Sequence, residues 1–364
     1  MTSSLPSHMT AYGIDGFGSP DVLTERRLPV PAPGPGQVLV EVAYCGVCRH
    51  DLLTRAGAFP RAQLPVVLGH QVSGQVAALG DGVDRLALGD RVMTMIFTGC
   101  GRCARCAEGR DSLCERQTPE FLGEDRDGGY AEYVVVEART TTRLPDALPL
   151  TEAAIMTCTL GTAYHAVVGR GEVSPDDLVV VTGASGGVGV HAIEVLRMLG
   201  ARAVGVVSSE ASVDAVRDAG ATDVIVSPDR RFAAELRDRH GRADVVLDVV
   251  GEPTLLESCH AVRPGGRVVV VGNVTGKKAL VPPAYLILKE ISLVGTKSCS
   301  LEEMDEVLRL VSDGSLRARV DTVLPLADCR QVHERMESGA NLGRVVLEVG
   351  GERRPTGTPA RTPA

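Results

Sequence analysis

The feature that most constrains this chain is a glycine-rich turn between two apolar runs, DLVVVTGASGGVGVHAIEVLRMLGARAVGVV, which begins at Asp177. The first run is rich in β-branched residues, apolar residues then recur at helical spacing, and a second apolar run follows. This order is typical of a βαβ unit that binds a dinucleotide, with the phosphates at the helix N-terminus. The expected cofactor-binding residues of the turn are Gly183, Gly186, Gly187, Val188 and Gly189.

Each glycine of this turn has a physical reason. Gly183 permits the tight turn. Gly186 and Gly187 let the backbone approach a pyrophosphate, and Gly189 lets the helix pack closely on the strand. A glycine triplet alone is a weak signal, but this one has a strand and a helix on its two sides.

Further apolar runs follow at the spacing of alternating strands and helices. They are DVIVS from residue 223, ADVVLDVVG from 243, RVVVVGN from 267 and ISLVGT from 291, with helical patterns such as PTLLESCHAV between them. Together with the βαβ unit they predict an α/β fold with six parallel strands in a doubly wound Rossmann sheet, and a dinucleotide-binding domain over residues 160–297. The alternative is a flavodoxin-like or other doubly wound fold that binds no dinucleotide.

The end of the second strand bears on the choice of cofactor. Sites specific for NAD usually have an acidic residue there, about twenty residues after the glycines, for the ribose hydroxyls. This chain has Val207 followed by Ser208 and Ser209, and no Arg or Lys follows at once. Without an acid to repel a 2′-phosphate, and with two hydroxyls that can donate to phosphate oxygens, Ser208 and Ser209 favour NADP(H) over NAD(H).

A second unusual feature is the segment GCGRCARCAEGRDSLC, residues 99–114, which holds four of the ten cysteines. Gly101 and Gly109 break it into a loop that can turn four thiolates onto one point, the tetrahedral set of a structural zinc. A disulfide pair would need an oxidising compartment, and the bacterial iron–sulfur run has a shorter last gap with Pro after it, where this chain has Glu115. We expect a structural zinc on Cys100, Cys103, Cys106 and Cys114.

The chain on both sides of the predicted Rossmann sheet has a different pattern. GQVLVEVAYCGVC, VVLGHQVSGQVAALG, GDRVMTM and GGYAEYVVV are short β runs separated by turns, which is typical of a small, partly open barrel. After the sheet come a helix, LEEMDEVLRLVSDGSL, and a final strand, GRVVLEV. We therefore expect a mainly β catalytic domain built from residues 1–159 and 298–364, with residues 1–8 and 351–364 as disordered tails.

Three more candidate ligands are found near this β-rich part. Cys48 lies in CGVCRHD, His70 in GHQVSG, and Cys158 in MTCTLGTAYHAV, just before the Rossmann segment. One His and two Cys from separate segments leave a fourth position open, as a catalytic zinc requires. The sequence thus predicts two zinc ions per chain.

The chain resembles the zinc-containing alcohol dehydrogenases of the medium-chain dehydrogenase/reductase family over residues 9–349. The resemblance is carried by GVCRHD, GHQVSGQV, GDRV, the four-cysteine segment, GGYAEY and VTGASGGVG. Two stretches, VTGASGGVGVHAIEV and YLILKEISLVG, look most similar to a branch that includes the acryloyl-coenzyme A reductases. The resemblance implies a GroES-like fold for the β-rich domain.

The resemblance also implies roles for single residues. Cys48, His70 and Cys158 match the ligands of a catalytic zinc, and Asp51 matches the carboxylate that orients the ligand histidine. Arg49, in the same motif, is expected to bind the cofactor. The expected catalytic residues are Cys48, His50, Asp51 and His70.

Two departures from the family pattern affect the expected reaction. His50 stands where the family usually has Ser or Thr in a proton relay, and Gln71 stands where it usually has Glu. The resemblance implies an enzyme that transfers a hydride between a nicotinamide cofactor and an alcohol or carbonyl substrate. The alternative is an enoyl reductase that acts on a C=C bond conjugated to a carbonyl, and a non-catalytic protein on this scaffold is a third class.

Composition excludes several partners. The net charge is −8 without a cluster of Lys and Arg, so neither nucleic acid nor an anionic membrane is expected as a partner. The first residues do not form a signal peptide and there is no apolar run long enough to cross a bilayer. We expect a cytoplasmic enzyme with a small-molecule substrate that forms a homo-oligomer, a dimer or a tetramer.

Overall fold

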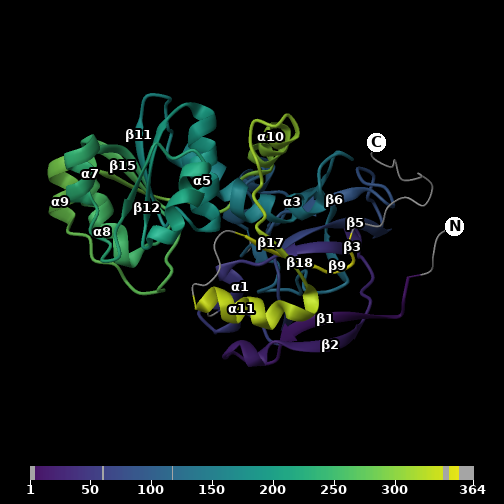
Figure 1. Cartoon of the computed structure of the whole chain (residues 1–364). Coiled ribbons are helices and arrows are strands. Elements are labelled where there is room, and N and C mark those ends of the chain that lie inside the picture. Colours follow the sequence, from purple (N-terminus) through teal and green to yellow (C-terminus); the bar gives the residue numbers. More distant parts are fainter. Residues whose placement is uncertain (1–4, 60, 117, 339–343, 352–364) are drawn as a thin grey trace, which may run out of the picture.

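The computed structural model describes residues 5–59, 61–116, 118–338 and 344–351. Two regions lie side by side (Figure 1). One is a parallel sheet with helices on its faces, and the other is a mainly antiparallel β region. Among the described residues, no helix has the length and apolar character needed to cross a membrane.

The parallel sheet has the strand order β13-β12-β11-β14-β15-β16. Its strands are β11 (Leu178–Thr182), β12 (Arg202–Val207), β13 (Asp223–Val226), β14 (Ala243–Asp248), β15 (Val262–Val270) and β16 (Ser292–Gly295). The connecting helices are α5 (Gly187–Leu199), α6 (Val213–Asp218), α7 (Ala233–His240), α8 (Glu252–Ala261) and α9 (Pro283–Lys289). Because the strand order reverses beside β11, the ends of β11 and β14 form the crevice where such sheets bind ligands. This arrangement confirms the predicted doubly wound Rossmann sheet.

The β region is organised around the long strand β3 (Gln37–Gly46). The main sheet runs β10-β6-β5-β3-β18-β17, and β9 also pairs with β3. Its other strands are β5 (Gln71–Leu79), β6 (Arg91–Thr94), β9 (Tyr133–Glu137), β10 (Thr141–Arg143), β17 (Thr322–Pro325) and β18 (Val345–Glu348). A three-stranded sheet joins β1 (His8–Ile14), β2 (Thr24–Pro29) and β4 (Val66–Val67), and β7 (Phe97–Thr98) pairs with β8 (Glu120–Phe121).

Short helices lie between the strands of this region, and the last of them lead into the parallel sheet. They are α1 (Arg49–Arg55), α2 (Ala104–Ala107), α3 (Leu150–Ile155), η4 (Met156–Leu160), α4 (Gly161–Tyr164) and η5 (His165–Arg170). Two longer helices follow the parallel sheet, α10 (Leu301–Ser312) and α11 (Cys329–Glu337). A Ser300–Glu303 capping box begins α10, which supports the predicted helix start.

The ends of the chain differ from the expectation of two disordered tails. Strand β1 begins at His8, which pairs with Pro29, so the predicted tail over residues 1–8 is wrong at its last residue. Of the expected tail over residues 351–364, only Gly351 lies within the described residues.

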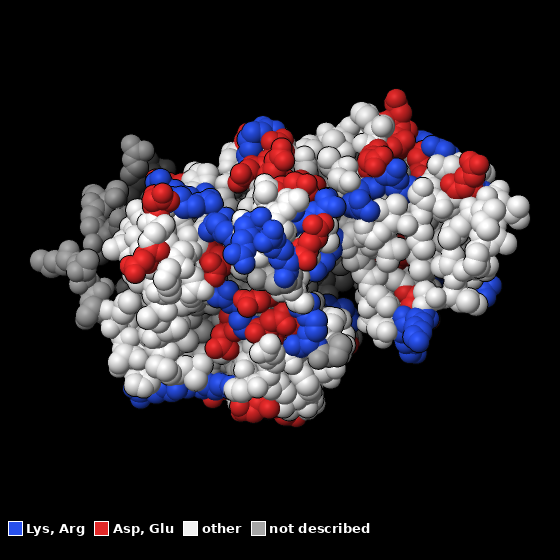
Figure 2. Space-filling model, turned by 180° about the vertical axis from the view of Figure 1, so that it is seen from behind, with Lys and Arg blue, Asp and Glu red and all other residues white. Residues whose placement is uncertain are grey.

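Charged side chains of both signs cover the face shown in Figure 2. Lys and Arg gather near the middle of this face, and Asp and Glu lie next to them. The basic groups do not form one continuous surface there.

Candidate metal and cofactor sites

Two cysteines and a histidine from separate segments meet at one end of the β region. Cys48 directly precedes α1, His70 directly precedes β5, and Cys158 lies in η4. Pairing of β3 with β5 places Gly46 opposite Gln71, which brings the residues just beyond these strand ends together. The two sulfurs are 3.9 Å apart, and His70 Nε2 is 3.4 Å from Cys158 Sγ. One donor atom of each residue lies within 4.8 Å of the others, so the three predicted ligands form one cluster.

Asp51 sets the orientation of the histidine in this cluster. Its Oδ1 lies 2.7 Å from His70 Nδ1, and its Oδ2 accepts a 2.8 Å hydrogen bond from the backbone N–H of Cys48. In the neutral imidazole the proton is then on Nδ1, which leaves the Nε2 lone pair facing the sulfurs. Burial disfavours the imidazolium, but the charge and hydrogen bond of Asp51, with the Cys48 thiol, outweigh it and raise the pKa of His70 to about 10. A metal ion that binds Nε2 must displace the proton that the imidazolium carries on that atom.

His50 lies beside the cluster in an aromatic stack. Its ring packs between Phe59 and Phe121, with centroid distances of 4.3 and 4.0 Å. Its Nε2 lies 2.6 Å from a carboxylate oxygen of Glu124, which is buried. Its Nδ1 has no hydrogen-bond partner among the described residues, and its ring centroid is 5.5 Å from that of His70.

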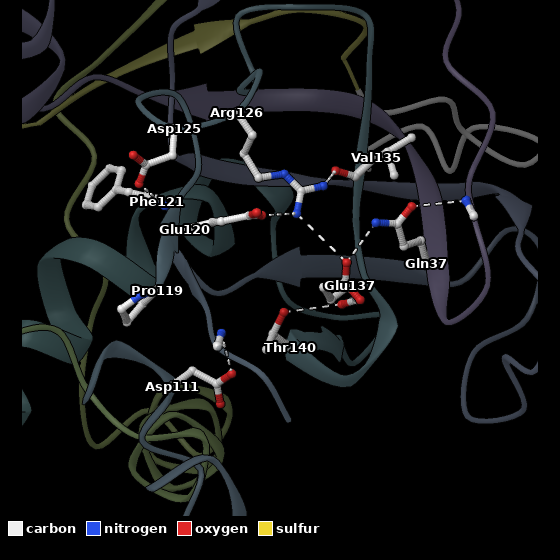
Figure 3. A network of polar contacts seen from close by, with 12 residues as sticks. Gln37, Asp111, Pro119, Glu120, Phe121, Asp125, Arg126, Val135, Glu137 and Thr140 are labelled. Carbon is white, nitrogen blue, oxygen red and sulfur yellow. Dashed lines mark hydrogen bonds and ion pairs between the residues drawn. The ribbon is translucent and has the colours of Figure 1, made fainter. Parts of the chain in front are cut away.

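Polar contacts hold the end of β8, which carries Phe121, and the following loop, which carries Glu124 (Figure 3). The Phe121 N–H donates to Asp125 at 2.9 Å, and Arg126 donates to the Val135 carbonyl in β9 at 2.7 Å. Because these contacts fix the loop to the sheet, the ring and carboxylate that face His50 have defined positions.

The four-cysteine segment also forms one cluster. Sulfur–sulfur distances are 3.5 Å for Cys103–Cys106, 3.9 Å for Cys103–Cys114 and 4.0 Å for Cys100–Cys106. Four sulfurs at about 2.3 Å from a tetrahedral zinc would be about 3.8 Å apart. Asp111 closes the segment, because its carboxylate accepts a 2.9 Å hydrogen bond from the backbone at residue 99. The cluster therefore has the dimensions that a zinc ion needs.

The glycine turn leaves no room for larger side chains. Gly183 has a φ of +60°, and a β-carbon on Gly189 would lie 2.4 Å from the Gly183 carbonyl oxygen. Gly186 is the cap residue of α5. A β-carbon on Gly187 would lie 2.5 Å from Nε of Arg344, so this glycine admits an arginine from the far end of the chain.

Arg344 is a candidate cofactor residue that sequence reasoning missed. Its side chain is buried and donates to the Val47 carbonyl at 2.9 Å. Its Nε is buried and has no hydrogen-bond partner within the described part of the chain. A guanidinium beside a helix N-terminus fits a phosphate. A single Arg before a strand carries no motif, so the sequence offered no signal for it.

The other predicted cofactor residues are more exposed. Ser208 and Ser209 follow β12 and are exposed, and the Ser209 hydroxyl accepts a 3.3 Å hydrogen bond from Ala211 N–H at the start of a short helix. Val188 is half-buried in the first turn of α5. Arg49 is exposed and is the first residue of α1, directly after Cys48.

A doubly wound sheet with a phosphate-type turn, beside a β region that gathers thiols and a histidine, is typical of metal-binding dehydrogenases. Two family models match the chain, "Alcohol dehydrogenase GroES-like domain" at residues 34–146 and "Zinc-binding dehydrogenase" at residues 187–313. The chain belongs to the alcohol dehydrogenase family of medium-chain dehydrogenases/reductases, and it is an oxidoreductase.

Relatives agree over nearly the whole length. An alcohol dehydrogenase of Geobacillus stearothermophilus is 31% identical, covering 94% of this chain and 100% of the relative. An acryloyl-coenzyme A reductase of Metallosphaera sedula is 32% identical, covering 88% and 95%. A solved structure, that of AibC, has 41% sequence identity to this chain and a TM-score of 0.88, and the match covers 94% of this chain and 96% of AibC. The predicted family is thereby confirmed.

Proposed function

We propose that the protein is a zinc-dependent oxidoreductase that transfers a hydride between a nicotinamide cofactor and an alcohol or carbonyl substrate. The observation that carries the proposal is the convergence of Cys48, His70 and Cys158, with Asp51 directing Nε2 of the histidine inward. Zinc on these three residues would polarise a carbonyl oxygen, and a nicotinamide cofactor at the glycine turn would supply or accept the hydride.

The chain's own residues have separate tasks in this reaction. The glycine turn and Arg344 bind the pyrophosphate of the cofactor. Phe59 and Phe121 hold the His50 ring in place between them, and 26% of the side chain remains exposed. Because Nε2 of His50 faces Glu124, Nδ1 is the atom left to exchange a proton with the substrate oxygen.

A second candidate function is the reduction of a C=C bond in an enoyl thioester. Two observations favour it, namely the full-length similarity to an acryloyl-coenzyme A reductase and the neutral Gln71 beside the cluster. Gln71 is buried, and its Oε1 accepts a 3.1 Å hydrogen bond from Thr159. An amide in place of a carboxylate leaves a bound metal more electrophilic.

A substrate panel separates the two candidates. Aldehydes, alcohols and enoyl thioesters are assayed for oxidation or reduction of both nicotinamide cofactors. Turnover of aldehydes or alcohols supports the first function, and turnover of enoyl thioesters alone supports the second. No turnover of any member by protein that holds zinc and cofactor would refute both.

We also propose that NADP(H) is preferred over NAD(H). Support comes from the exposed Ser208 and Ser209, where an acidic residue would repel a 2′-phosphate. The ratio of kcat/KM for the two cofactors tests this, and a clear preference for NADH would show that the serines bind the ribose hydroxyls instead.

Two zinc ions per chain are proposed from the two ligand clusters. Elemental analysis of the purified protein should give two, and a value of one or none after growth in zinc would contradict the proposal. The four-thiolate site should contribute to folding, because binding energy at such a site is folding energy.

We propose a homo-oligomer as the working form. Leu280, Ile287 and Leu288 are 82%, 72% and 83% exposed on and before α9. Strand β16 is the last strand of the parallel sheet, and within the described residues it pairs only with β15. Exposed apolar side chains beside a free edge are typical of a subunit contact, and light scattering measures the mass in solution.

A further inference from the structure

A cavity of about 330 Å³ lies where the four-cysteine segment, η5 and the end of β16 meet. This volume is within the range of small-molecule sites. Arg110 comes from the cysteine segment, His165 and Arg170 from η5, and Thr296 and Lys297 from the stretch after β16. The cavity is therefore built by three segments far apart in the sequence.

The lining of this cavity is positively charged. Arg110, Arg170 and Lys297 line it, and no Asp or Glu is among the described residues that line it. The Lys297 ammonium also donates to the Ser112 carbonyl at 2.9 Å. The nearby carboxylate of Glu303 lies 2.8 Å from His165 Nδ1 and accepts from the Ser300 N–H at 2.8 Å, so its charge is already engaged.

Several of these polar groups lack a partner inside the protein. The Arg110 side chain has no hydrogen bond or ion pair with any described residue, and Arg170 uses only Nε, which donates to the Gly295 carbonyl at 2.9 Å. Within the same described ranges, Thr296 Oγ1 is buried and has no hydrogen-bond partner. Free guanidinium donors and a free hydroxyl in one cavity are suited to phosphate oxygens.

A chain of ring contacts links the cavity to the three-ligand cluster. The Lys297 ammonium lies 4.1 Å from the centre of the Phe97 ring, and Phe97 packs on Phe121 at 4.8 Å. Phe121 in turn lies 5.0 Å from the His70 ring. The cavity is thus at the outer end of the aromatic wall that faces the proposed reaction centre.

We propose that this cavity binds phosphate on the tail of the substrate, with Arg110, Arg170 and Lys297 as the phosphate ligands. The inference rests on the proposed function, and within it favours a thioester on a phosphate-bearing carrier over a free aldehyde. The reacting carbonyl would lie at the metal cluster and the three cations would hold the distal phosphates, with the buried rings of Phe97 and Phe121 packed between the two sites. A free phosphate ion shares this chemistry, so the experiment separates the two sources.

The test compares two thioesters with the same reacting group. Crotonyl-coenzyme A carries phosphates, and crotonyl-N-acetylcysteamine lacks them. The variants Arg110→Ala and Arg170→Ala should raise KM for the first about tenfold, the loss of one charge-assisted hydrogen bond, and leave kcat/KM for the second unchanged. Arg102→Ala is the matched control, because Arg102 is an exposed arginine of the same segment that does not line the cavity.

The outcomes are distinct. An equal loss with both thioesters, or no loss with either, overturns the proposal. If neither thioester nor any carbonyl compound is turned over, the proposed function fails. Phosphate binding in the cavity is then tested separately by calorimetry. With saturating NADP⁺ in the cofactor site, adenosine 3′,5′-bisphosphate should bind the wild type and bind Arg110→Ala about tenfold more weakly. Equal binding to both proteins, or inorganic phosphate binding as tightly as the bisphosphate, overturns the assignment to a substrate tail.

Discussion

Replacing Asp51 by Asn should cost the three-ligand site its zinc, because the carboxylate accepts two hydrogen bonds that an amide cannot accept together. Oδ1 faces His70 Nδ1 at 2.7 Å and Oδ2 faces the Cys48 N–H at 2.8 Å, and the side chain is buried. If the new NH₂ group faces the Cys48 N–H, two buried donors oppose each other, at a cost of about 1–3 kcal/mol. If it faces His70, Nδ1 must accept, and the proton moves to Nε2 and blocks the ligand atom.

Either orientation of the amide predicts a zinc affinity about 10- to 100-fold lower at this site. Competition with a chelator, followed by elemental analysis, measures it: Asp51→Asn should lose one zinc at a chelator concentration that leaves the wild type intact, and keep the other. The matched control is Asp111→Asn in the cysteine segment, where a single oxygen, Oδ1, accepts from the backbone N–H of residue 99 and from Arg139, so an amide oxygen can keep both contacts and both zinc ions should be retained. An Asp51→Asn protein that keeps both ions at the wild-type competition midpoint would refute the reasoning.

Further predictions concern three other residues. His50→Ala should lower kcat by roughly 10- to 1000-fold with unchanged zinc content. His50→Ser should recover part of the activity if the reaction is carbonyl reduction. If His50→Ala turns over at the wild-type rate across pH 6 to 9, His50 has no part in the mechanism. Arg344→Lys should raise KM for the cofactor about tenfold with little change in zinc content, since Lys cannot make the forked contact; an unchanged KM in steady-state assays would show that Arg344 is only structural. Burial lowers the pKa of His191 to about 4, so the folded protein holds it neutral while the unfolded chain binds a proton below about pH 6.5. This group should therefore lower the free energy of unfolding by about 3 kcal/mol as the pH drops from 6.5 to 4. In denaturant unfolding, the free energy of unfolding of His191→Gln should depend less steeply on pH than that of the wild type. Equal pH dependence of the two proteins would contradict this prediction.

Local patterns made the Rossmann sheet predictable from sequence. The glycine turn, the helix after it and the apolar runs on both sides are all defined within a few tens of residues, and each strand run corresponds to a strand of the structure. The candidate ligand residues could be singled out for a similar reason, since Cys48 and His70 stand in short motifs. Their meeting depends on the β3–β5 register, which the motifs do not encode.

Other features depend on contacts that no local pattern reveals. Glu124, in the loop after β8, contacts His50 of α1, 74 residues earlier in the sequence, and an acidic residue in a loop rich in charged residues would be expected to lie on the surface. Arg344 approaches Gly187 across the whole Rossmann segment. The cationic cavity joins residues from three segments, none of which is unusually basic. Helix α11 and strand β17 were not predicted, because both elements are short and contain few apolar residues.

The position of β18 has a consequence for synthesis of the chain. β18 lies between β3 and β17, and Val346 and Leu347 pair with Gly46 and Cys45, close to the candidate ligand Cys48. All strands of the Rossmann sheet are complete once residue 295 is made, whereas the end of β3 at Tyr44–Gly46, beyond its pairing with β9, lacks its partner strand until β18 leaves the ribosome. The nascent chain should therefore acquire its nucleotide-binding half first. A truncation before residue 345 would leave an aggregation-prone open edge beside the two thiols and the imidazole of the candidate metal site.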